Sequence, residues 1–146
     1  MNARQRYATA VEAFNRGDPA GFAALYAEDA IVHDPQYPQP LNGRAAIEQD
    51  TADVRRAMPD ARFTLHAVLQ DGATVAVHYG LSGTHLGPLS LPDGEIAPTG
   101  RRLDLPGAVF SRVDGEGLVL EERRYFDVAS LLAQVGVLDT VTAPTG

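Results

Sequence analysis

The chain has 146 residues, no cysteine and a formal net charge of -7, and arginine supplies all 12 of its basic side chains. This length is enough for one domain whose core needs no covalent cross-link, while the lack of cysteine excludes disulfides, thiolate metal sites and a cysteine nucleophile. The acidic net charge offers no basic face for a nucleic acid, and no apolar run approaches the ~20 residues of a membrane span, so we expect neither nucleic acid nor membrane as a partner. The N-terminus lacks a signal pattern, so we expect a cytoplasmic protein.

Helical spacing of apolar residues dominates the first third of the chain. Gly17 ends the first predicted helix, and Asp18 is a suitable N-cap for a second, short helix with Pro19 at its first position. Pro59 ends a third helix, which opens at Asn42-Gly43. This part of the sequence therefore predicts helix, helix, strand and helix, over residues 3–16, 18–27, 30–34 and 42–58.

From Arg62 onward the apolar period changes to two, which is typical of strands. A turn near Asp71-Gly72 joins the first two strands, and a three-residue loop over 70–72 would bring their apolar sets to one face of the sheet. A two-residue loop at Asp71-Gly72 would send the two sets to opposite faces, so we prefer the longer loop. In that register His66 and His78 become neighbours on the other face.

Residues 85–100 are rich in proline and glycine, and we expect them to form a long loop without strands. Two further strands follow over 103–113 and 118–126, and apolar residues at helical spacing predict a closing helix that reaches Leu138. Helices followed by an antiparallel sheet indicate an α+β fold. A strongly curved sheet around the first and third helices would leave a pocket inside a cone.

Short motifs in a fixed order run through nearly the whole chain. They are Phe14-Asn15-Arg16-Gly17-Asp18, Tyr26-Ala27-Glu28-Asp29, His33-Asp34-Pro35, Gly43-Arg44, Pro59-Asp60, Gly83-Thr84-His85, Pro98-Thr99-Gly100-Arg101, Val113-Asp114-Gly115, and Asp127 followed by Leu131-Leu132-Ala133-Gln134-Val135-Gly136. The ordered set resembles the SnoaL-like polyketide cyclases of the nuclear-transport-factor-2-like (NTF2-like) superfamily. The resemblance implies a conical α+β domain over residues 1–139, often dimeric, with a ligand pocket in the cone. Residues 140–146 are expected to form a flexible tail.

Asp127 stands where the strand over 118–126 meets the closing helix. Aspartate is a favoured helix N-cap, so one interpretation is structural. The resemblance implies another, because Asp127 matches the catalytic aspartate of SnoaL-like cyclases, which acts as acid and base in an intramolecular aldol ring closure without metal or cofactor. An apolar pocket would raise the pKa of such a carboxyl group and suit it to this task. Strand alternation places Arg123 and Tyr125 on the face of Asp127, and we predict that both contact the substrate.

Further candidates for the site come from the earlier strands and loops. Asp34 resembles the general base of ketosteroid isomerases, although it could equally be a turn aspartate before a proline. His33 is another candidate acid or base, but alternation points it away from Asp34 unless a bulge intervenes. We also predict substrate contacts from side chains in or near the pocket, namely Phe14, Tyr79 and His85.

Several positions depart from what related enzymes would require. Ketosteroid isomerases need a tyrosine and a protonated aspartate where this chain has Ala10 and Val109. Limonene-epoxide-hydrolase relatives need an arginine and an aspartate where it has Tyr79 and Leu81. The cyclases place polar partners, notably a histidine, on the strand that here spans 103–113, which contains no histidine and no glutamine. These departures argue against the first two activities and keep a non-catalytic interpretation open.

From these observations we expect a cofactor-independent enzyme that acts by acid/base catalysis on a hydrophobic, polycyclic or ester-bearing small molecule, as a polyketide cyclase or a related isomerase. The alternative is a non-catalytic module that binds a small molecule or dimerises. No metal site is expected, because the four histidines share no ligand spacing. A homodimer is expected from the resemblance and from the few charges on the outer face of residues 64–84.

Overall fold

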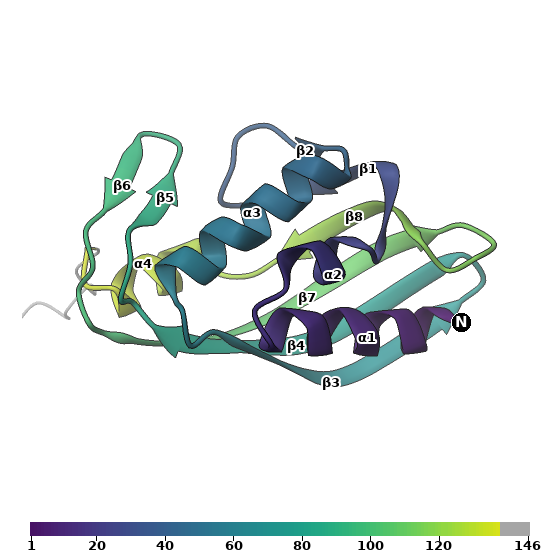
Figure 1. The fold of residues 1–146 in the computed structure, drawn as a ribbon, viewed down its shortest axis with the longest axis horizontal. Coiled ribbons are helices and arrows are strands. Elements are labelled where there is room, and N and C mark those ends of the chain that lie inside the picture. The colour runs from purple at the N-terminus through teal and green to yellow at the C-terminus, as the bar shows by residue number, and fades with distance from the viewer. Residues whose placement is uncertain (138–146) are drawn as a thin grey trace, which may run out of the picture.

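The computed structural model describes residues 1–137 and shows an α+β fold (Figure 1). Within this range the helices are α1 (Ala3–Asn15), α2 (Pro19–Ala23), α3 (Arg44–Ala57) and α4 (Val128–Gln134). The strands are β1 (Tyr26–His33), β2 (Leu41–Asn42), β3 (Arg62–Asp71), β4 (Thr74–Thr84), β5 (Leu89–Leu91), β6 (Gly94–Ile96), β7 (Arg102–Val113) and β8 (Val119–Tyr125). None of these helices is long and apolar enough to cross a membrane. Leu138 and the predicted tail over 140–146 lie outside the described residues.

The larger sheet has the strand order β2–β1–β8–β7–β4–β3. Every neighbouring pair in it is antiparallel except β1 and β8, which run parallel. Strands β5 and β6 form a separate two-stranded sheet. The expected α+β fold is therefore confirmed. The parallel pair places the first strand of the chain beside the last, a pairing that strand patterns alone do not indicate.

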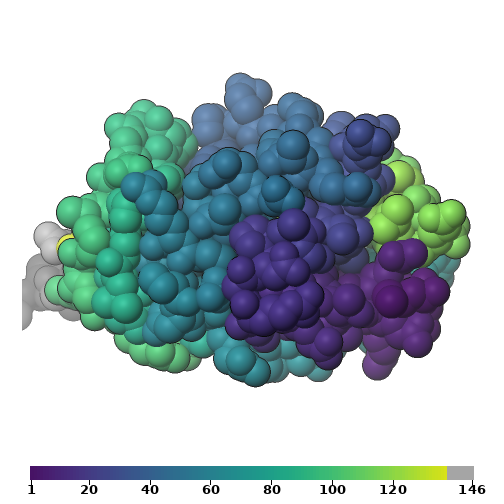
Figure 2. All heavy atoms as spheres, in the orientation of Figure 1, coloured from purple at the N-terminus to yellow at the C-terminus, as the bar shows by residue number. Residues whose placement is uncertain are grey.

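Helices α1, α2 and α3 lie against one face of the curved sheet (Figure 1), and their side chains cover most of that face in the space-filling view (Figure 2). The apolar stripe of α1 reaches the sheet through Tyr7, Ala10 and Phe14, and each is at most 5% exposed. Ile47 of α3 is fully buried against the same face. Burial of these stripes holds the helices on the sheet.

Helix α2 ends and β1 begins earlier than the sequence predicts. The predicted helix extends to Ala27 and the predicted strand starts at Ala30, whereas α2 ends at Ala23 and β1 starts at Tyr26. Tyr26 pairs with Val119 of β8, and its side chain is 1% exposed. Pairing with a strand far along the chain outweighs the local helical spacing here.

The β3–β4 hairpin has a different register from the predicted one. Asp71 pairs with Thr74, so the loop is Gly72-Ala73, and Gly72 has a φ of 59° that glycine adopts without strain. A bulge between Leu65 and Ala67 then shifts the register by one residue. Neither loop considered from the sequence is the observed one.

The bulge at His66 decides which side chains of β3 face the helices. Leu65 and Val68 are an odd number of residues apart, yet both pack into the core. Leu69, which simple alternation would bury, is 67% exposed. The predicted proximity of His66 and His78 on the outer face is confirmed, with their ring centroids 4.9 Å apart.

The segment 85–100 is not the strand-free loop that the sequence predicts. Strands β5 and β6 pair antiparallel within it, and Leu89 of β5 is buried. The backbone N–H of Gly87 donates to the carbonyl of Ala57 at the end of α3, at 3.0 Å. A Cβ atom on Gly87 would lie 1.9 Å from the carbonyl oxygen of Arg56, so only glycine allows this close approach. Burial of Leu89 and the contact with α3 order a stretch whose composition indicates a loop.

Asn15 joins the end of α1 to the edge strand β3. Its side-chain N–H donates to the Phe63 carbonyl at 3.0 Å, and its side-chain oxygen accepts from the Phe63 N–H at 2.8 Å. We predict that Asn15→Ala lowers the free energy of unfolding by about 1–3 kcal/mol, because it leaves two partly buried backbone groups unpaired. Urea denaturation followed by circular dichroism measures this.

Gln49→Ala is the matched control for Asn15→Ala. It removes an exposed side-chain hydrogen bond to Asp53 and should change the same free energy by at most about 0.5 kcal/mol. Equal effects of the two substitutions would contradict the role assigned to Asn15.

Candidate functional site

A cavity of about 140 Å³ lies between the helices and the curved sheet. Most of the side chains that line it are aromatic or aliphatic, and they include Phe14, Phe22, Phe63, Leu105, Phe126 and Leu131. A compact polar group forms part of the lining, and it contains Asp34, Gln36, Asp50, Glu122 and Arg124. We call this group the polar wall. The cavity therefore combines an apolar interior with several ionisable side chains.

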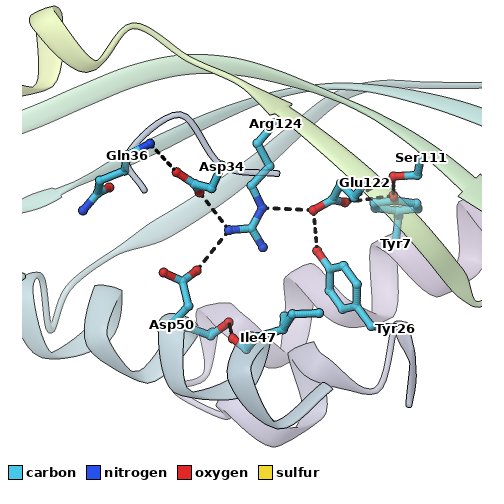
Figure 3. A network of polar contacts seen from close by, with 10 residues as sticks. Tyr7, Tyr26, Asp34, Gln36, Ile47, Asp50, Ser111, Glu122 and Arg124 are labelled. Carbon is cyan, nitrogen blue, oxygen red and sulfur yellow. Dashed lines mark hydrogen bonds and ion pairs between the residues drawn. The ribbon is translucent and has the colours of Figure 1, made fainter. Parts of the chain in front are cut away.

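Arg124 of β8 holds the polar wall together (Figure 3). Strand alternation turns Glu122 and Arg124 toward the helices, while Arg123 between them is exposed. The Nε atom of Arg124 donates to Glu122 at 3.0 Å, and its Nη1 atom donates to Asp34 at 3.1 Å and to Asp50 at 3.0 Å. The guanidinium thus links β8 to the residue that follows β1 and to α3. Its side chain is 12% exposed, and none of the three carboxylates exceeds 7%.

Glu122 contacts four hydrogen-bonding side chains. Its Oε2 atom accepts from Arg124 and from the Tyr26 hydroxyl at 2.8 Å, and its Oε1 atom lies 3.3 Å from the Tyr7 hydroxyl and 3.2 Å from the Ser111 hydroxyl. These two hydroxyls are also 2.5 Å from each other, so one donates to the other and one proton remains for Oε1. Burial, and then the charge of Glu122, raise the pKa of both tyrosines well above the usual range, so both remain donors. Both oxygens of Glu122 therefore accept hydrogen bonds from within the protein, and Glu122 anchors Arg124.

Asp34 and Asp50 share a single nitrogen of Arg124. The other oxygen of Asp34 accepts from the Gln36 backbone N–H at 2.8 Å, and the other oxygen of Asp50 accepts from the Tyr37 hydroxyl at 2.7 Å. Burial raises the pKa of the Asp34 carboxyl above its ordinary value, against the lowering influence of Arg124. Burial, and then the charge of Asp50, also raise the pKa of Tyr37 beyond its ordinary range. The Asp34 carboxyl group therefore keeps its proton to a higher pH than an ordinary aspartate does.

Two donors of the lining keep a proton without a partner within residues 1–137. One is Nη2 of Arg124 (Figure 3), which has two N–H groups and meets the Tyr26 hydroxyl with only one of them, and the other is the hydroxyl of Tyr79. Neither is sealed inside the protein, because the only fully buried side-chain polar atom without a partner in that range is Nε2 of His85. Burial raises the pKa of Tyr79 to about 12, so its hydroxyl stays protonated at neutral pH. Both donors are available to an oxygen atom of a ligand.

The structure brings Phe14, Asp34 and Tyr79 together among the predicted site residues, since all three line the cavity. Asp127 is elsewhere: its side chain is exposed and caps α4, with Oδ1 accepting from the Ser130 N–H at 3.2 Å. Of the two interpretations of Asp127, the capping role is the one with contacts in the structure.

Arg123 and Tyr125 share the face of Asp127, as alternation predicts, but that face points away from the cavity. Tyr125 is 55% exposed, and its ring meets the ring of Phe110 edge to face with 6.0 Å between centroids. Alternation groups residues by face and does not say which face is buried, so the predicted substrate contacts of this pair have no geometric support. The outer face is where we expect a second copy of the chain, and the homodimer stays a prediction.

Neither candidate histidine shares the cavity with Asp34. His33 points to the other side of β1, where its Nε2 atom lies 3.1 Å from a carboxylate oxygen of Glu121, and this contact lowers the pKa of Glu121. His85 is fully buried, with its Nδ1 atom 2.9 Å from the Thr99 hydroxyl. Across the described part of the chain, no three His, Asp or Glu side chains come together in an arrangement that could hold a metal ion.

Asp50, Glu122 and Arg124 are not among the site residues that the sequence predicts. Asp50 does carry a signal, because it lies three residues after Ile47 on the apolar stripe of α3, and a charged residue in such a stripe indicates a buried partner. No comparable signal separates Glu122 and Arg124 from their neighbours, since charged residues occupy both faces of β8 over 121–124.

A family model described as a SnoaL-like domain matches residues 7–122, which include every member of the polar wall except Arg124. The chain belongs to the SnoaL-like family. The family membership expected from the ordered motifs is therefore confirmed.

Solved structures share the fold of this SnoaL-like protein over nearly its whole length. TsrD from Streptomyces laurentii has a TM-score of 0.78 at 20% identity, over 92% of this chain and 95% of its own. IdmH from Streptomyces antibioticus, described as a candidate polyketide cyclase, has a TM-score of 0.73 at 28% identity, over 94% and 100%. A candidate polyketide cyclase from Xanthomonas campestris pv. campestris has a TM-score of 0.72 at 27% identity, over 92% and 96%. These structures confirm the NTF2-like fold.

We predict that Asp127→Ala lowers the free energy of unfolding by about 1 kcal/mol, because α4 loses its N-cap. Asp127 contacts no member of the polar wall, so the NMR signals of the Tyr7 and Tyr26 rings, which bond to Glu122, should not move. Asp127→Asn keeps a capping oxygen and should be close to wild type in urea denaturation. Displaced ring signals in either variant would show that Asp127 acts on the cavity.

Asp34→Asn tests how burial affects the Asp34 carboxyl. Because its pKa is raised in the folded state, the folded protein holds a proton that the unfolded chain releases above its pKa of 3.8, and wild type loses stability as the pH rises from there through the folded pKa. Asp34→Asn lacks this loss. The stability difference between the two proteins, measured by urea unfolding from about pH 3 to about pH 8, should shift in favour of the variant as the pH rises.

Asp60→Asn provides a control of opposite sign. Hydrogen bonds from the Thr84 N–H and hydroxyl lower the pKa of Asp60, so its contribution to stability is present above the unfolded pKa of 3.8 and is lost as the pH falls. The free energy of unfolding of wild type, relative to that of Asp60→Asn, should therefore increase as the pH rises. The same trend for both variants would contradict the assignment for Asp34.

Proposed function

We propose that this SnoaL-like protein is a cofactor-independent enzyme of the polyketide-cyclase type, in which Asp34 acts as acid and base on an apolar carbonyl compound. The observation that carries the proposal is the position of Asp34: a buried carboxyl group with a raised pKa, in an apolar cavity, beside a guanidinium with a free N–H. A carboxyl group whose pKa is raised toward the working pH is a better base when ionised. The catalytic assignment thereby moves from Asp127 to Asp34.

The proposed reaction is an intramolecular aldol ring closure. Asp34 takes a proton from the carbon next to a carbonyl group, and the charge moves to the carbonyl oxygen, where Nη2 of Arg124 donates a hydrogen bond. The enolate carbon then attacks a second carbonyl of the same molecule and forms the new carbon–carbon bond. The alkoxide that results takes the proton back from Asp34. Substrate and product are isomers, so the cycle consumes nothing.

The other members of the polar wall serve this reaction by position. Glu122 fixes the guanidinium through Nε, and Asp50 shares Nη1 with Asp34, so that Nη2 remains for the substrate. The Gln36 N–H orients the Asp34 carboxyl. Two relatives above 25% identity, IdmH and the Xanthomonas campestris protein, are described as candidate polyketide cyclases, which supports the reaction type.

Proton exchange on a simple ketone tests the first step without knowledge of the natural substrate. In deuterium oxide, wild type should speed the loss of the α-proton signal of propiophenone in proton NMR, and Asp34→Asn should lose about 100-fold or more of that rate, the typical contribution of a general base. Asp127→Asn is the control and should retain the wild-type rate.

Two results would contradict the enzyme proposal. One is an equal rate of exchange in wild type and Asp34→Asn. The other is a carbon-13 carboxyl titration that places the folded pKa of Asp34 at or below 3.8. Either result would favour the alternative, a non-catalytic SnoaL-like module that binds a small molecule.

A further inference from the structure

The volume of the cavity limits what can enter it. At about 140 Å³, the cavity is close to the ~150 Å³ of an engineered apolar cavity that binds benzene. Sites for drug-sized ligands usually span roughly 300–1,000 Å³. One substituted ring fits within this volume, whereas two or three fused rings would extend beyond it into the opening of the cavity. A polycyclic substrate, as expected from the sequence, would therefore be only partly enclosed.

The charges of the polar wall limit the ligand in a second way. An anionic group would meet Asp34 and Asp50, while a cationic group would meet Nη2 of Arg124. With Glu122 included, three carboxyl groups surround one guanidinium, so an anionic ligand is poorly placed anywhere in the polar wall, and a cationic group is poorly placed at the free N–H of Arg124. A neutral ligand with an acceptor oxygen suits the free donors, Nη2 of Arg124 and the hydroxyl of Tyr79.

Gly107 allows Tyr79 to lie along the wall of the cavity. The two residues face each other across the β4–β7 pairing, and Gly107 is buried. A Cβ atom on Gly107 would lie 2.4 Å from the hydroxyl oxygen and from the Cζ atom of Tyr79. Any larger residue at position 107 would therefore force the tyrosine ring to move. The side chain of Tyr79 keeps its position because Gly107 has none.

We propose that the site selects a neutral aromatic ketone or aldehyde with a single ring, and that the pair formed by Tyr79 and Gly107 determines this specificity. The carbonyl oxygen lies at the donors of Arg124 and Tyr79, and the ring lies among the apolar side chains that include Phe63 and Leu105. The inference rests on the proposed function for the identity of the reacting group, but the size and charge limits concern binding alone.

The test is a series of binding measurements by ligand-observed NMR titration. The probes are propiophenone with one ring, 2-propionylnaphthalene with two, 2-propionylanthracene with three, and propylbenzene, which lacks the carbonyl. Wild type should bind propiophenone at least about tenfold more tightly than each of the others. Hydrophobicity alone would favour the larger ketones, so a falling affinity with ring number is a specific signature of the size limit.

Substitutions of Gly107 and Tyr79 test which residue controls the size of the ligand and which one recognises its carbonyl oxygen. Gly107→Ala should weaken propiophenone binding about tenfold or more, while Gly115→Ala, whose added Cβ meets nothing within 4 Å, should not change it. Tyr79→Phe keeps the ring and removes the donor, so it should reduce the preference for propiophenone over propylbenzene and leave the order by ring number unchanged. Tyr79→Phe also serves where Gly107→Ala fails to fold.

The possible results separate this inference from the proposed function. If 2-propionylnaphthalene binds wild type as tightly as propiophenone, or if no probe binds below millimolar concentration, the inference is overturned. If propylbenzene matches propiophenone, the carbonyl assignment is overturned. If the predicted order holds but Asp34→Asn exchanges propiophenone protons as fast as wild type, the binding inference is supported while the acid/base proposal fails.

Discussion

The burial of the Arg124 guanidinium is the constraint on which the rest of the structure depends. A guanidinium cannot be neutralised by losing its proton, so taking it out of water costs several kcal/mol unless carboxylates surround it. Glu122, Asp34 and Asp50 provide that environment from β8, from the end of β1 and from α3. The tertiary contacts that bring these elements together therefore also assemble the polar wall of the cavity.

The three carboxyl groups around Arg124 have different surroundings, and this separates structural from chemical roles. Both oxygens of Glu122 are bonded within the protein, one to Arg124 and Tyr26 and the other to the Tyr7–Ser111 pair, so Glu122 fixes the guanidinium. Asp34 has fewer donors around it, faces the cavity and has a raised pKa. The same apolar surroundings that make this carboxyl group costly to ionise make it useful as a base, which is the usual conflict between stability and function at such sites.

Much of the fold could be predicted from local sequence, because caps and apolar spacing act over a few residues. Asp18 caps α2 and Asn42-Gly43 precedes α3, as expected. The predictions from sequence are wrong where contacts between distant parts of the chain determine the local structure. A bulge at His66, set by pairing of β3 with β4, changes the register of the hairpin, and packing of Leu89 orders the segment 85–100. Asp34 and Tyr79 were predicted for the site, whereas Arg124 was not.

The sequence by itself determined which residues of β8 share a face, because strand side chains alternate with a period of two. It therefore grouped Arg123, Tyr125 and Asp127 correctly, and equally Glu122 with Arg124. Only the tertiary structure decided which group is inside, since that depends on the side of the sheet that α1, α2 and α3 cover. The helices cover the side of Arg124. For this reason Asp127 is a helix cap on the surface, and the buried charges meet at Arg124.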